Sequence, residues 1–527
     1  MRCVVFRCIC DVCALSRALT KAIHQTHACQ RRPRRYLGMI VTVLVSGCAV
    51  GPNFERPPAP NVHGYTSGPA PVRTVSASVA GGAAQRFVRD RDIAGDWWHL
   101  FHSRPLKTLI EDALKNNHDL RAAQAALRVA QANTAAQRGA FLPSVDGNFS
   151  ATRVKIPSDV TGEVTDPSIY NVFTGQVSVS YTPDVFGANR RAVESLEAQA
   201  EAQRFQLEAT YLTLTSNIVV AAVQEASLRG QIEATQSIIK IATDLLDLLR
   251  RQRALGQVAE ADVLAQEAAL AQIEQTLPTL EKQLAQQRHL LAALAGRLPS
   301  QEPAQRFVLA ALYLPRELPL SLPSKLIAQR PDVRAAEANL RSASAQIGVA
   351  IANRLPNITL TANTGSTAFQ LSQLFSPGTG FWGVAGAVTQ PIFHGGTLLF
   401  RERAARAAYD QAAEQYQSTV ITAFQNVADT LSALQTDAVA LQKAVNTERA
   451  AARSLAITRQ RMQLGDVNYL ALLNAQQTYQ QALINLVQAK ANRYADTAAL
   501  FQALGGGWWN RSDVAPEQPL SIGDVLQ

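Results

Sequence analysis

Cysteine is absent from most of this 527-residue chain. The six cysteines all lie at its start: Cys3, Cys8, Cys10, Cys13, Cys29 and Cys48. Because none occurs from Ala49 to Gln527, a disulfide framework is excluded for the main body. The spacing of the second to fourth cysteines could suit a soft metal, but no ordered scaffold is predicted around them. We therefore interpret residues 1–47 as a segment that is not part of the mature protein.

The sequence also lacks the common motifs of enzymes. Its eight histidines form no HExxH pair or spaced metal-binding set, and there is no GxSxG elbow or P-loop. His394-Gly395-Gly396 faintly resembles an esterase oxyanion loop, but its place at a strand-to-helix corner favours a structural turn. Trp97-Trp98 and Trp508-Trp509 are interpreted as helix-end packing rather than binding platforms. We predict no catalytic site, metal site or cofactor.

The formal net charge of +9 arises mainly in the first 47 residues. These residues hold eight Lys or Arg and one acid, which leaves 42 basic and 40 acidic residues in the remainder. A remainder so nearly neutral, with charges of both signs mixed along helices, argues against a nucleic-acid partner. Within the leader, the basic cluster Arg31–Arg35 precedes an apolar run, Tyr36–Val45, which is too short to span a bilayer. This order is typical of a secretory signal.

The end of this leader, Val45-Ser46-Gly47-Cys48, resembles the lipobox of bacterial lipoproteins. In that class the leader is cut before the cysteine, which then carries lipid, and a residue other than Asp at the next position favours the outer membrane. The alternative is an ordinary signal peptide with a chance cysteine. We expect 1–47 to be a signal peptide with an overlong lead-in, from a start site assigned too early. Residues 48–95, rich in Pro, Gly and Ser, are predicted to be a slack, lipid-anchored linker.

The body of the chain is an internal duplication. The stretch DLRAAQAALRVAQANTAAQRGAFLPSV from Asp119 aligns with DVRAAEANLRSASAQIGVAIANRLPNI from Asp332, and RQRALGQV from Arg251 aligns with RQRMQLGDV from Arg459. A repeat of this length is too long for a solenoid unit. We predict a first structural repeat at 96–298, a connection at 299–323, a second repeat at 324–507 and a C-terminal tail at 508–527.

Each repeat is predicted to contain a helix, two strands, a long helix, a turn and a return helix. The first helix is expected from Pro105 to Gly139 and the first long helix from Ala188 to Leu255. An apolar seam that steps by four and three residues, as in a coiled coil, is predicted from Leu207 to Leu249 on this helix and from Val420 to Val445 on its counterpart in the second repeat. Residues 144–153, 173–182, 357–364 and 381–389 alternate with period two and are predicted to be strands. Gly256 and Gly465 are predicted to take the left-handed conformation at helix-to-helix turns. Pro278 should kink or restart the first return helix.

These strands have the length of tilted transmembrane β-strands. Four strands cannot close a barrel, and an open sheet edge is not tolerated in lipid, so the chain must oligomerise. Two copies would give eight strands and three would give twelve, and the pattern does not choose between them. The competing interpretation is a lipid-anchored periplasmic coiled-coil spacer without a pore, although a spacer needs no segments of period two.

Taken together, these features resemble the TolC-type outer-membrane efflux proteins of the lipoprotein branch. The residues that carry the resemblance are Cys48–Phe54, the segment DWWHLFHSRPLKTLIEDALKNNHDL from Asp96, the duplicated unit and the two glycine turns. The resemblance implies a mainly α-helical fold with a small β part, and a homotrimer with a 12-stranded outer-membrane β-barrel continued by a coiled-coil α-helical periplasmic barrel. It also implies a passive exit duct for small molecules, working with a periplasmic adaptor and an inner-membrane transporter, often of the resistance-nodulation-division class.

The same resemblance suggests site residues. Gly256 and Gly465 would be the tips where the adaptor docks, and acidic side chains would ring a narrow periplasmic gate. Asp262 fits such a position, with Asp466 and Asn474 as weaker candidates. The alternative for Asp262 is a carboxylate that stabilises a helix start through the helix dipole. The sequence does not name the exported cargo.

Overall fold

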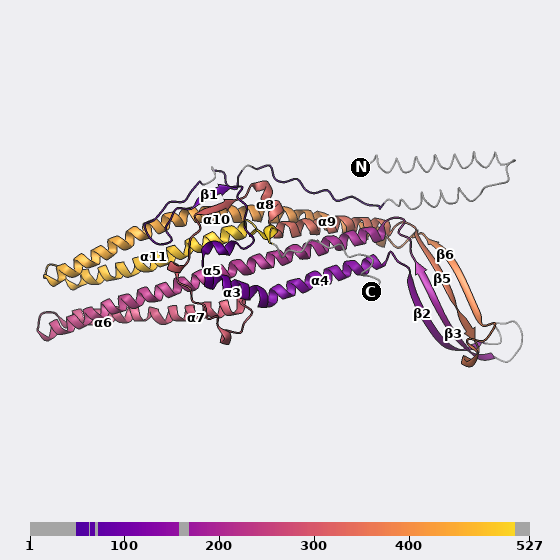
Figure 1. The fold of residues 1–527 in the computed structure, drawn as a ribbon, viewed down its shortest axis with the longest axis horizontal. Helices are drawn as coiled ribbons and strands as arrows, with labels where there is room; N and C mark the ends of the chain where they lie inside the picture. Colours follow the sequence, from indigo (N-terminus) through magenta and orange to yellow (C-terminus); the bar gives the residue numbers. More distant parts are fainter. Residues whose placement is uncertain (1–48, 63, 69–71, 157–167, 512–527) are drawn as a thin grey trace.

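The computed structural model is an elongated molecule with a sheet at one end and two helical hairpin turns at the other (Figure 1). It describes residues 49–62, 64–68, 72–156 and 168–511. The predicted class, mainly helical with a small β part, is confirmed. None of the helices in the described ranges has both the length and the apolar character needed to cross a lipid bilayer.

The two longest helices, with 67 residues each, run along the length of the helical part of the molecule: α5, Ala188–Ala254, and α10, Thr397–Gln463. At 1.5 Å per residue each is about 100 Å long. The apolar seam predicted on each is confirmed, because the seam positions of both helices are buried or half-buried. In α10 the buried seam residues include Val420, Leu431 and Leu441.

The return helices pack along these two rods. After α5 the chain returns through α6, Glu260–Glu274, and α7, Thr276–Leu294, and after α10 it returns through α11, Tyr469–Ala503. The predicted restart at Pro278 is confirmed, because this proline is the third residue of α7. Such a position suits proline, since the first amides of a helix have no partner within it.

The first helix of each repeat is broken in two, and the expectation of one helix from Pro105 to Gly139 is wrong. The chain forms α3, Arg104–Asn116, and α4, His118–Gly139. Asn117 between them has ψ of 128°, and its side-chain oxygen accepts the amide of Leu120 at 3.0 Å. Asparagine is a favoured N-cap, so it starts a new helix here. The second repeat has a similar break between α8, Pro323–Gln329, and α9, Pro331–Ala352.

The four predicted strands form one antiparallel sheet in the order β2-β3-β5-β6. Their bounds are Ser144–Ile156, Ser168–Tyr181, Asn357–Ala368 and Gly380–Thr389. Strands from the two repeats meet between β3 and β5, where Val177 lies opposite Thr364. The sheet is built from both halves of the duplication, and within the chain its outer strands β2 and β6 each have one neighbour.

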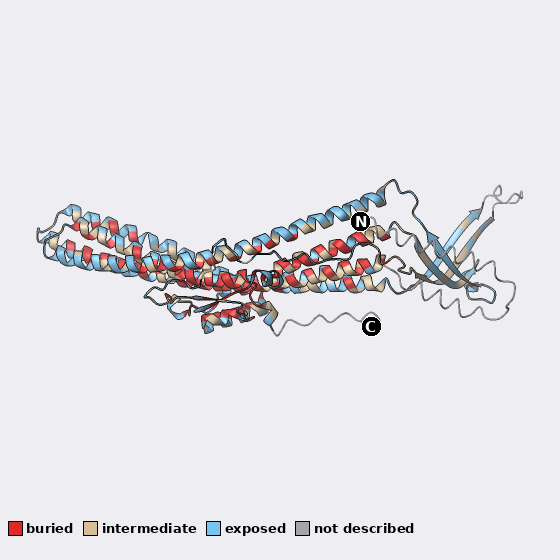
Figure 2. Ribbon diagram, turned by 90° about the horizontal axis from the view of Figure 1, so that it is seen from above, coloured by how far each residue is buried: buried red, intermediate tan, exposed pale blue. Residues whose placement is uncertain are grey.

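The middle of the molecule, which we call the waist, contains the largest buried core (Figure 2). Here β1, Arg86–Arg89, pairs in parallel with β4, Glu317–Leu320, a pairing that the sequence analysis did not predict. Trp97 stacks on Phe501 of α11 at 5.1 Å between ring centroids, and the Trp508 indole donates to the carbonyl of Gln329 at 2.7 Å. The interpretation of the tryptophan pairs as packing residues is therefore confirmed.

Arg493 of α11 fixes the segment before β1 at the waist. Its guanidinium is fully buried and donates to the carbonyl of Ala83 and to Gln85 Oε1, both at 3.0 Å, and to Thr74 Oγ1 at 3.3 Å. A buried charge costs free energy unless it is hydrogen-bonded in this way. The segment is consequently part of the folded waist.

Candidate functional site

Both hairpin turns have the geometry predicted for a glycine C-cap. Gly256 and Gly465 have φ of +71° and +74°. In each turn the amide of the next residue, Gln257 or Asp466, donates to a carbonyl five residues back at 2.9 Å. This pattern is the Schellman motif, which needs a left-handed residue that glycine adopts without strain. A Cβ added at either glycine would meet nothing within 4 Å, so the glycines serve the backbone turn and the space around them is open.

An exposed leucine precedes each of these glycines. Leu255 is 72% exposed and Leu464 is 76% exposed. The sequence analysis did not single them out, although the duplicated motif places them at matching positions. Each hairpin turn therefore presents one exposed apolar side chain beside its glycine.

The three predicted gate residues lie near the end of the molecule that carries these two hairpin turns, which we call the tip end, but they are not joined to one another. Asp262 is the third residue of α6 and is half-buried. Asp466 forms an exposed ion pair with Arg461, 2.7 Å between Oδ2 and Nε. Asn474 is exposed on α11. In the described part of the chain no hydrogen bond or ion pair links these three residues, so their assignment to a gate stays a prediction.

A buried polar link that sequence reasoning missed joins the two hairpins beside Asp262. The Tyr469 hydroxyl, at the start of α11, donates to Gln266 Oε1 of α6. Gln266 Nε2 in turn donates to the carbonyl of Ala242 in α5 at 2.8 Å. Gln266 is fully buried and Tyr469 is 8% exposed. Burial, with a smaller contribution from the Asp262 carboxylate, raises the pKa of Tyr469 to about 12.

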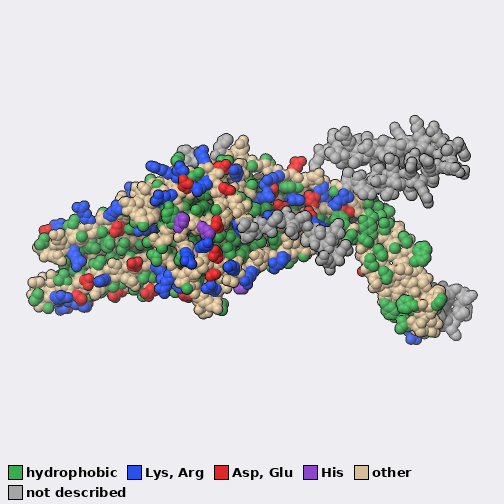
Figure 3. Space-filling view, in the orientation of Figure 1, with side chains coloured by type: hydrophobic (Ala, Val, Ile, Leu, Met, Phe, Trp, Pro, Cys, Tyr) green, Lys and Arg blue, Asp and Glu red, His purple; other side chains and the backbone are tan. Residues whose placement is uncertain are grey.

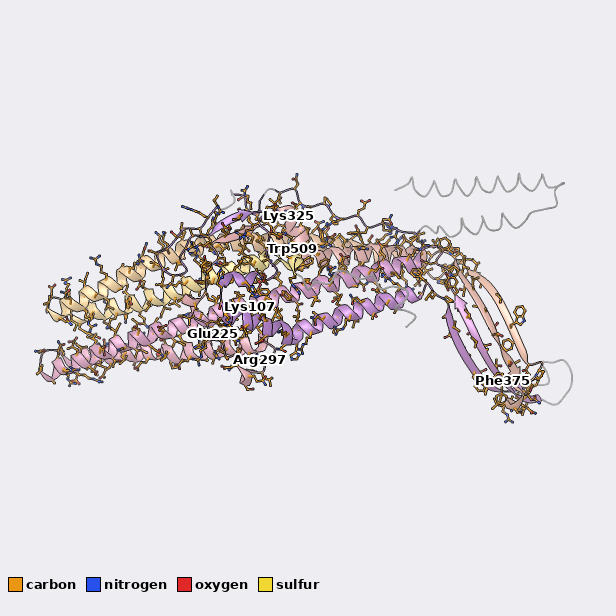
Figure 4. The ribbon with its side chains drawn as sticks, in the orientation of Figure 1. Lys107, Glu225, Arg297, Lys325, Phe375 and Trp509 are labelled. Atoms are coloured by element: carbon orange, nitrogen blue, oxygen red, sulfur yellow. The ribbon has the colours of Figure 1, made fainter. Side chains whose placement is uncertain are left out.

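Buried charges also connect helices nearer the waist. Glu225 of α5 is fully buried, and its Oε1 accepts from Arg229 at 2.6 Å and from Arg288 of α7 at 3.1 Å (Figure 4). On α10 and α11, burial followed by the neighbouring Asp437 carboxylate raises the pKa of Asp496 to about 7. Within the described residues no three His, Cys, Asp or Glu side chains form a group that could hold a metal ion.

The sheet presents one apolar and one polar face. Strand register places a set of large apolar residues on the same face, each at least 46% exposed: Val145, Phe149, Val177, Leu360, Trp382, Val384 and Val388. The opposite face carries mainly small polar residues: Ser144, Asp146, Asn148, Gln176, Ser178, Thr361 and Asn363. Figure 3 shows charged side chains crowding the helices, whereas the visible part of the sheet is mainly hydrophobic or uncharged, with a basic side chain at its far end.

The segment that follows the predicted lipid anchor is fixed in place. Cys48 itself lies outside the described residues. From the next residue on, the chain contacts α5 and α9, and Arg56 forms an ion pair with Glu337 at 2.9 Å. The Tyr65 hydroxyl donates to the carbonyl of Ser321 at 2.8 Å. The expectation of a slack linker is therefore wrong for these residues, because their backbone and side chains bond to the folded body.

Comparison with known proteins agrees with this architecture. Residues 109–297 and 322–506 match the family model described as "Outer membrane efflux protein". The chain is 32% identical over 498 residues to the toluene efflux pump outer membrane protein TtgF of Pseudomonas putida, a match that covers 92% of this chain and 98% of TtgF. It is 28% identical over 476 residues to the outer membrane protein OprJ of Pseudomonas aeruginosa, covering 89% of this chain and 95% of OprJ.

A solved structure has the same fold. The open state of the Neisseria gonorrhoeae MtrE outer membrane channel superposes with a TM-score of 0.74 at 26% identity, covering 89% of this chain and all of that chain. Members of this family are transport channels rather than enzymes. The chain therefore belongs to the outer membrane efflux protein family, and it is the outer-membrane component of an efflux system.

Proposed function

We propose that three copies of this chain form a passive exit duct, with a 12-stranded β-barrel in the outer membrane and a helical tunnel in the periplasm. The duct would receive small molecules from an inner-membrane transporter through a periplasmic adaptor. No cofactor is involved, and a lipid on Cys48 would anchor the mature protein to the outer membrane. The names of the relatives, which include toluene and antibiotic efflux pumps, support small organic molecules as the cargo class.

The observation that carries this proposal is the sheet. Its exposed apolar face suits lipid, its polar face suits a water-filled lumen, and its outer strands β2 and β6 each have only one neighbour in the chain. Lipid-exposed sheet edges do not occur in membranes because unpaired backbone groups cost several kcal/mol each. Pairing β6 of one copy with β2 of the next would remove these edges and close a barrel.

The helices also leave a surface for neighbouring copies. Within the chain α10 packs on α9 and α11. Its remaining surface carries exposed Ile421, Val439 and Ile457, which are 68%, 43% and 48% exposed. Covering such residues with the adjacent copy would bury apolar area along the whole rod, and burial stabilises by about 25 cal/mol per Å².

The tip end would serve as the entrance. Leu255 and Leu464 beside the glycine turns would take the helical hairpin of the adaptor. The Tyr469–Gln266 link holds the two hairpins of one copy together, and Asp262 from each copy would approach the same axis. Adaptor and transporter binding would favour a dilated arrangement, which shifts an equilibrium between two packings.

Planar-bilayer recording of the purified oligomer tests the duct. We expect stable, low-conductance channels that widen when Asp262→Ala is introduced, with Asp466→Ala as the comparison because that carboxylate is exposed and paired locally. Channels unaffected by Asp262→Ala would retain the duct and remove Asp262 from the gate. The absence of channels from protein shown to be folded and trimeric would overturn the duct and favour the coiled-coil spacer.

A further inference from the structure

We propose that Arg191, Gly187 and Gly348 form a socket that holds the residues directly after the predicted lipid-bearing cysteine at the junction of sheet and helices. The socket would make Arg191 a positioning residue for the lipid anchor. This role rests on the proposed lipidation of Cys48, whereas the socket itself consists only of described residues. We call residues 49–53 the anchor segment.

Arg191 makes the polar contacts of the socket. Its guanidinium donates to the carbonyl of Val50 at 3.1 Å, to Asn53 Oδ1 at 2.8 Å and, more weakly, to the carbonyl of Gly51 at 3.4 Å. Glu194 accepts from the same group at 2.7 Å and balances its charge. The Arg191 side chain is only 6% exposed. Apart from the bond to Glu194, these hydrogen bonds all go to one short segment, so the buried arginine forms a built binding site for that segment. Charge-assisted hydrogen bonds of this kind are the strong ones.

The glycines let the backbones approach more closely than any side chain would permit. A Cβ on Gly51 would lie 2.5 Å from Gly348 Cα in α9, and a Cβ on Gly187 would lie 2.6 Å from Ala49 Cα. The Val50 amide also donates to the carbonyl of Phe186 at 3.1 Å, in the corner between β3 and α5. The anchor segment therefore has polar partners in α5 and in the β3–α5 corner, and it packs closely against Gly348 of α9.

The location of the socket gives it a function. Ala49 lies against Gly187, the residue that precedes α5 where the sheet gives way to helices (Figure 1). Consecutive Cα atoms are about 3.8 Å apart, so acyl chains on residue 48 would begin at this junction. A lipid held at this height would enter the bilayer beside the strands. Fixing one end of the chain in advance lowers the entropy cost of inserting the sheet, the usual advantage of preorganisation.

Gly348→Ala is the sharpest test because it blocks the socket without changing any charge. The added Cβ would lie 2.8 Å from both Arg191 Cγ and the Val50 carbonyl oxygen. Alanine is a better helix former than glycine, so α9 itself should not suffer. Gly139→Ala is the matched control, because Gly139 is also helical and its Cβ would meet nothing within 4 Å. Arg191→Gln is the second test variant.

The first measurement is hydrogen–deuterium exchange of the full mature protein. In Gly348→Ala and Arg191→Gln, peptides covering the anchor segment should exchange at least about tenfold faster, because the Val50 amide loses its protection. Gly139→Ala should match the unmodified protein. Unchanged exchange in both test variants would overturn the socket.

The second measurement separates lipid positioning from simple packing. In lipidated protein, both test variants should lower the fraction of heat-stable oligomer in outer-membrane extracts by at least twofold. The same two substitutions are then introduced into Cys48→Ser protein, which is secreted with a leader that the general signal peptidase cuts. In this protein without lipid they should cause no further loss of heat-stable oligomer. Equal losses with and without lipid, or no loss at all, would overturn the positioning role. Mass spectrometry of the mature N-terminal peptide separates failure of the proposed lipidation from failure of the socket. An unmodified Cys48 would remove the positioning role of Arg191 but leave the exchange result for the socket intact.

Discussion

Replacing Tyr469 by phenylalanine tests whether the buried link at the tip end holds the two hairpins together. The ring would stay in place, but Gln266 Oε1 would lose its donor while remaining buried. Leaving a buried acceptor without a partner costs about 1–3 kcal/mol. Since 1.4 kcal/mol is tenfold in an equilibrium constant, separation of the hairpins should become about 5- to 150-fold more favourable.

The pH dependence gives this prediction a signature of its own. Tyrosine in an unfolded chain has a pKa of about 10, whereas Tyr469 in the folded protein has a pKa of about 12. Between these values the folded state keeps a proton that the open state loses, so stability falls as pH rises through this window. The full effect is about 3 kcal/mol. Phenylalanine has no such proton, so the variant should lose the tyrosine part of the alkaline sensitivity.

Hydrogen–deuterium exchange at the tip end, measured from pH 7.5 to 11 with correction for intrinsic exchange rates, checks both parts. Tyr479→Phe is the matched control, because this tyrosine packs in the same region of α11 and its ring can stay in place. Exchange that changes by less than twofold in Tyr469→Phe, or by the same factor in the control, would refute the reasoning.

Three further substitutions follow from the same structure. Val177→Asp places a charge on the apolar face of the sheet and should severely reduce the amount of oligomer in the outer membrane, whereas Ser178→Asp on the polar face should be tolerated. A normal oligomer yield for Val177→Asp on electrophoresis of unheated samples would contradict the assignment of this face to lipid. Gly465→Ala should destabilise its turn by about 1–2 kcal/mol through its positive φ, seen as faster exchange in that turn alone, and an unchanged rate would argue against left-handed strain there. Asp437→Asn should flatten the pH dependence of the melting temperature between pH 5 and 8. The reason is that Asp496, with a pKa of about 7, otherwise makes the folded state less stable as pH rises from about 4 to 7. A melting temperature that varies with pH as steeply as in the unmodified protein would rule out the interaction between Asp437 and Asp496.

The long helices, the strands and the glycine turns could be predicted because each rests on a local period or a local backbone requirement. The seam on α5 runs from Leu207 to Leu249, about twelve helical turns. Alternation along β3 places Val177 and Val179 on one face of the strand, whatever packs against that face. The break at Asn117 escaped the analysis because one capping residue interrupts an otherwise continuous run of good helix formers.

Features that depend on distant contacts could not be predicted. Strands β1 and β4 have four residues each, show no useful alternation and pair across more than 200 residues of sequence. Gln266 resembles the many surface glutamines of these helices, and only its tertiary surroundings bury it. The Pro-rich composition after Cys48 suggested a slack linker because composition does not reveal that Arg191, far along the chain, binds its backbone.

The parallel pair β1–β4 has a mechanical consequence. It ties the segment before the first repeat to the connection between the repeats, and Arg493 secures the same segment to α11. Both rods pass the waist near their middle, with one arm of paired helices toward the tips and the other toward the strands. A lateral force applied at the tips should be absorbed by bending of the arm on that side. In the proposed duct, the strands would then stay closed as a barrel while the tip end of the molecule opens and closes.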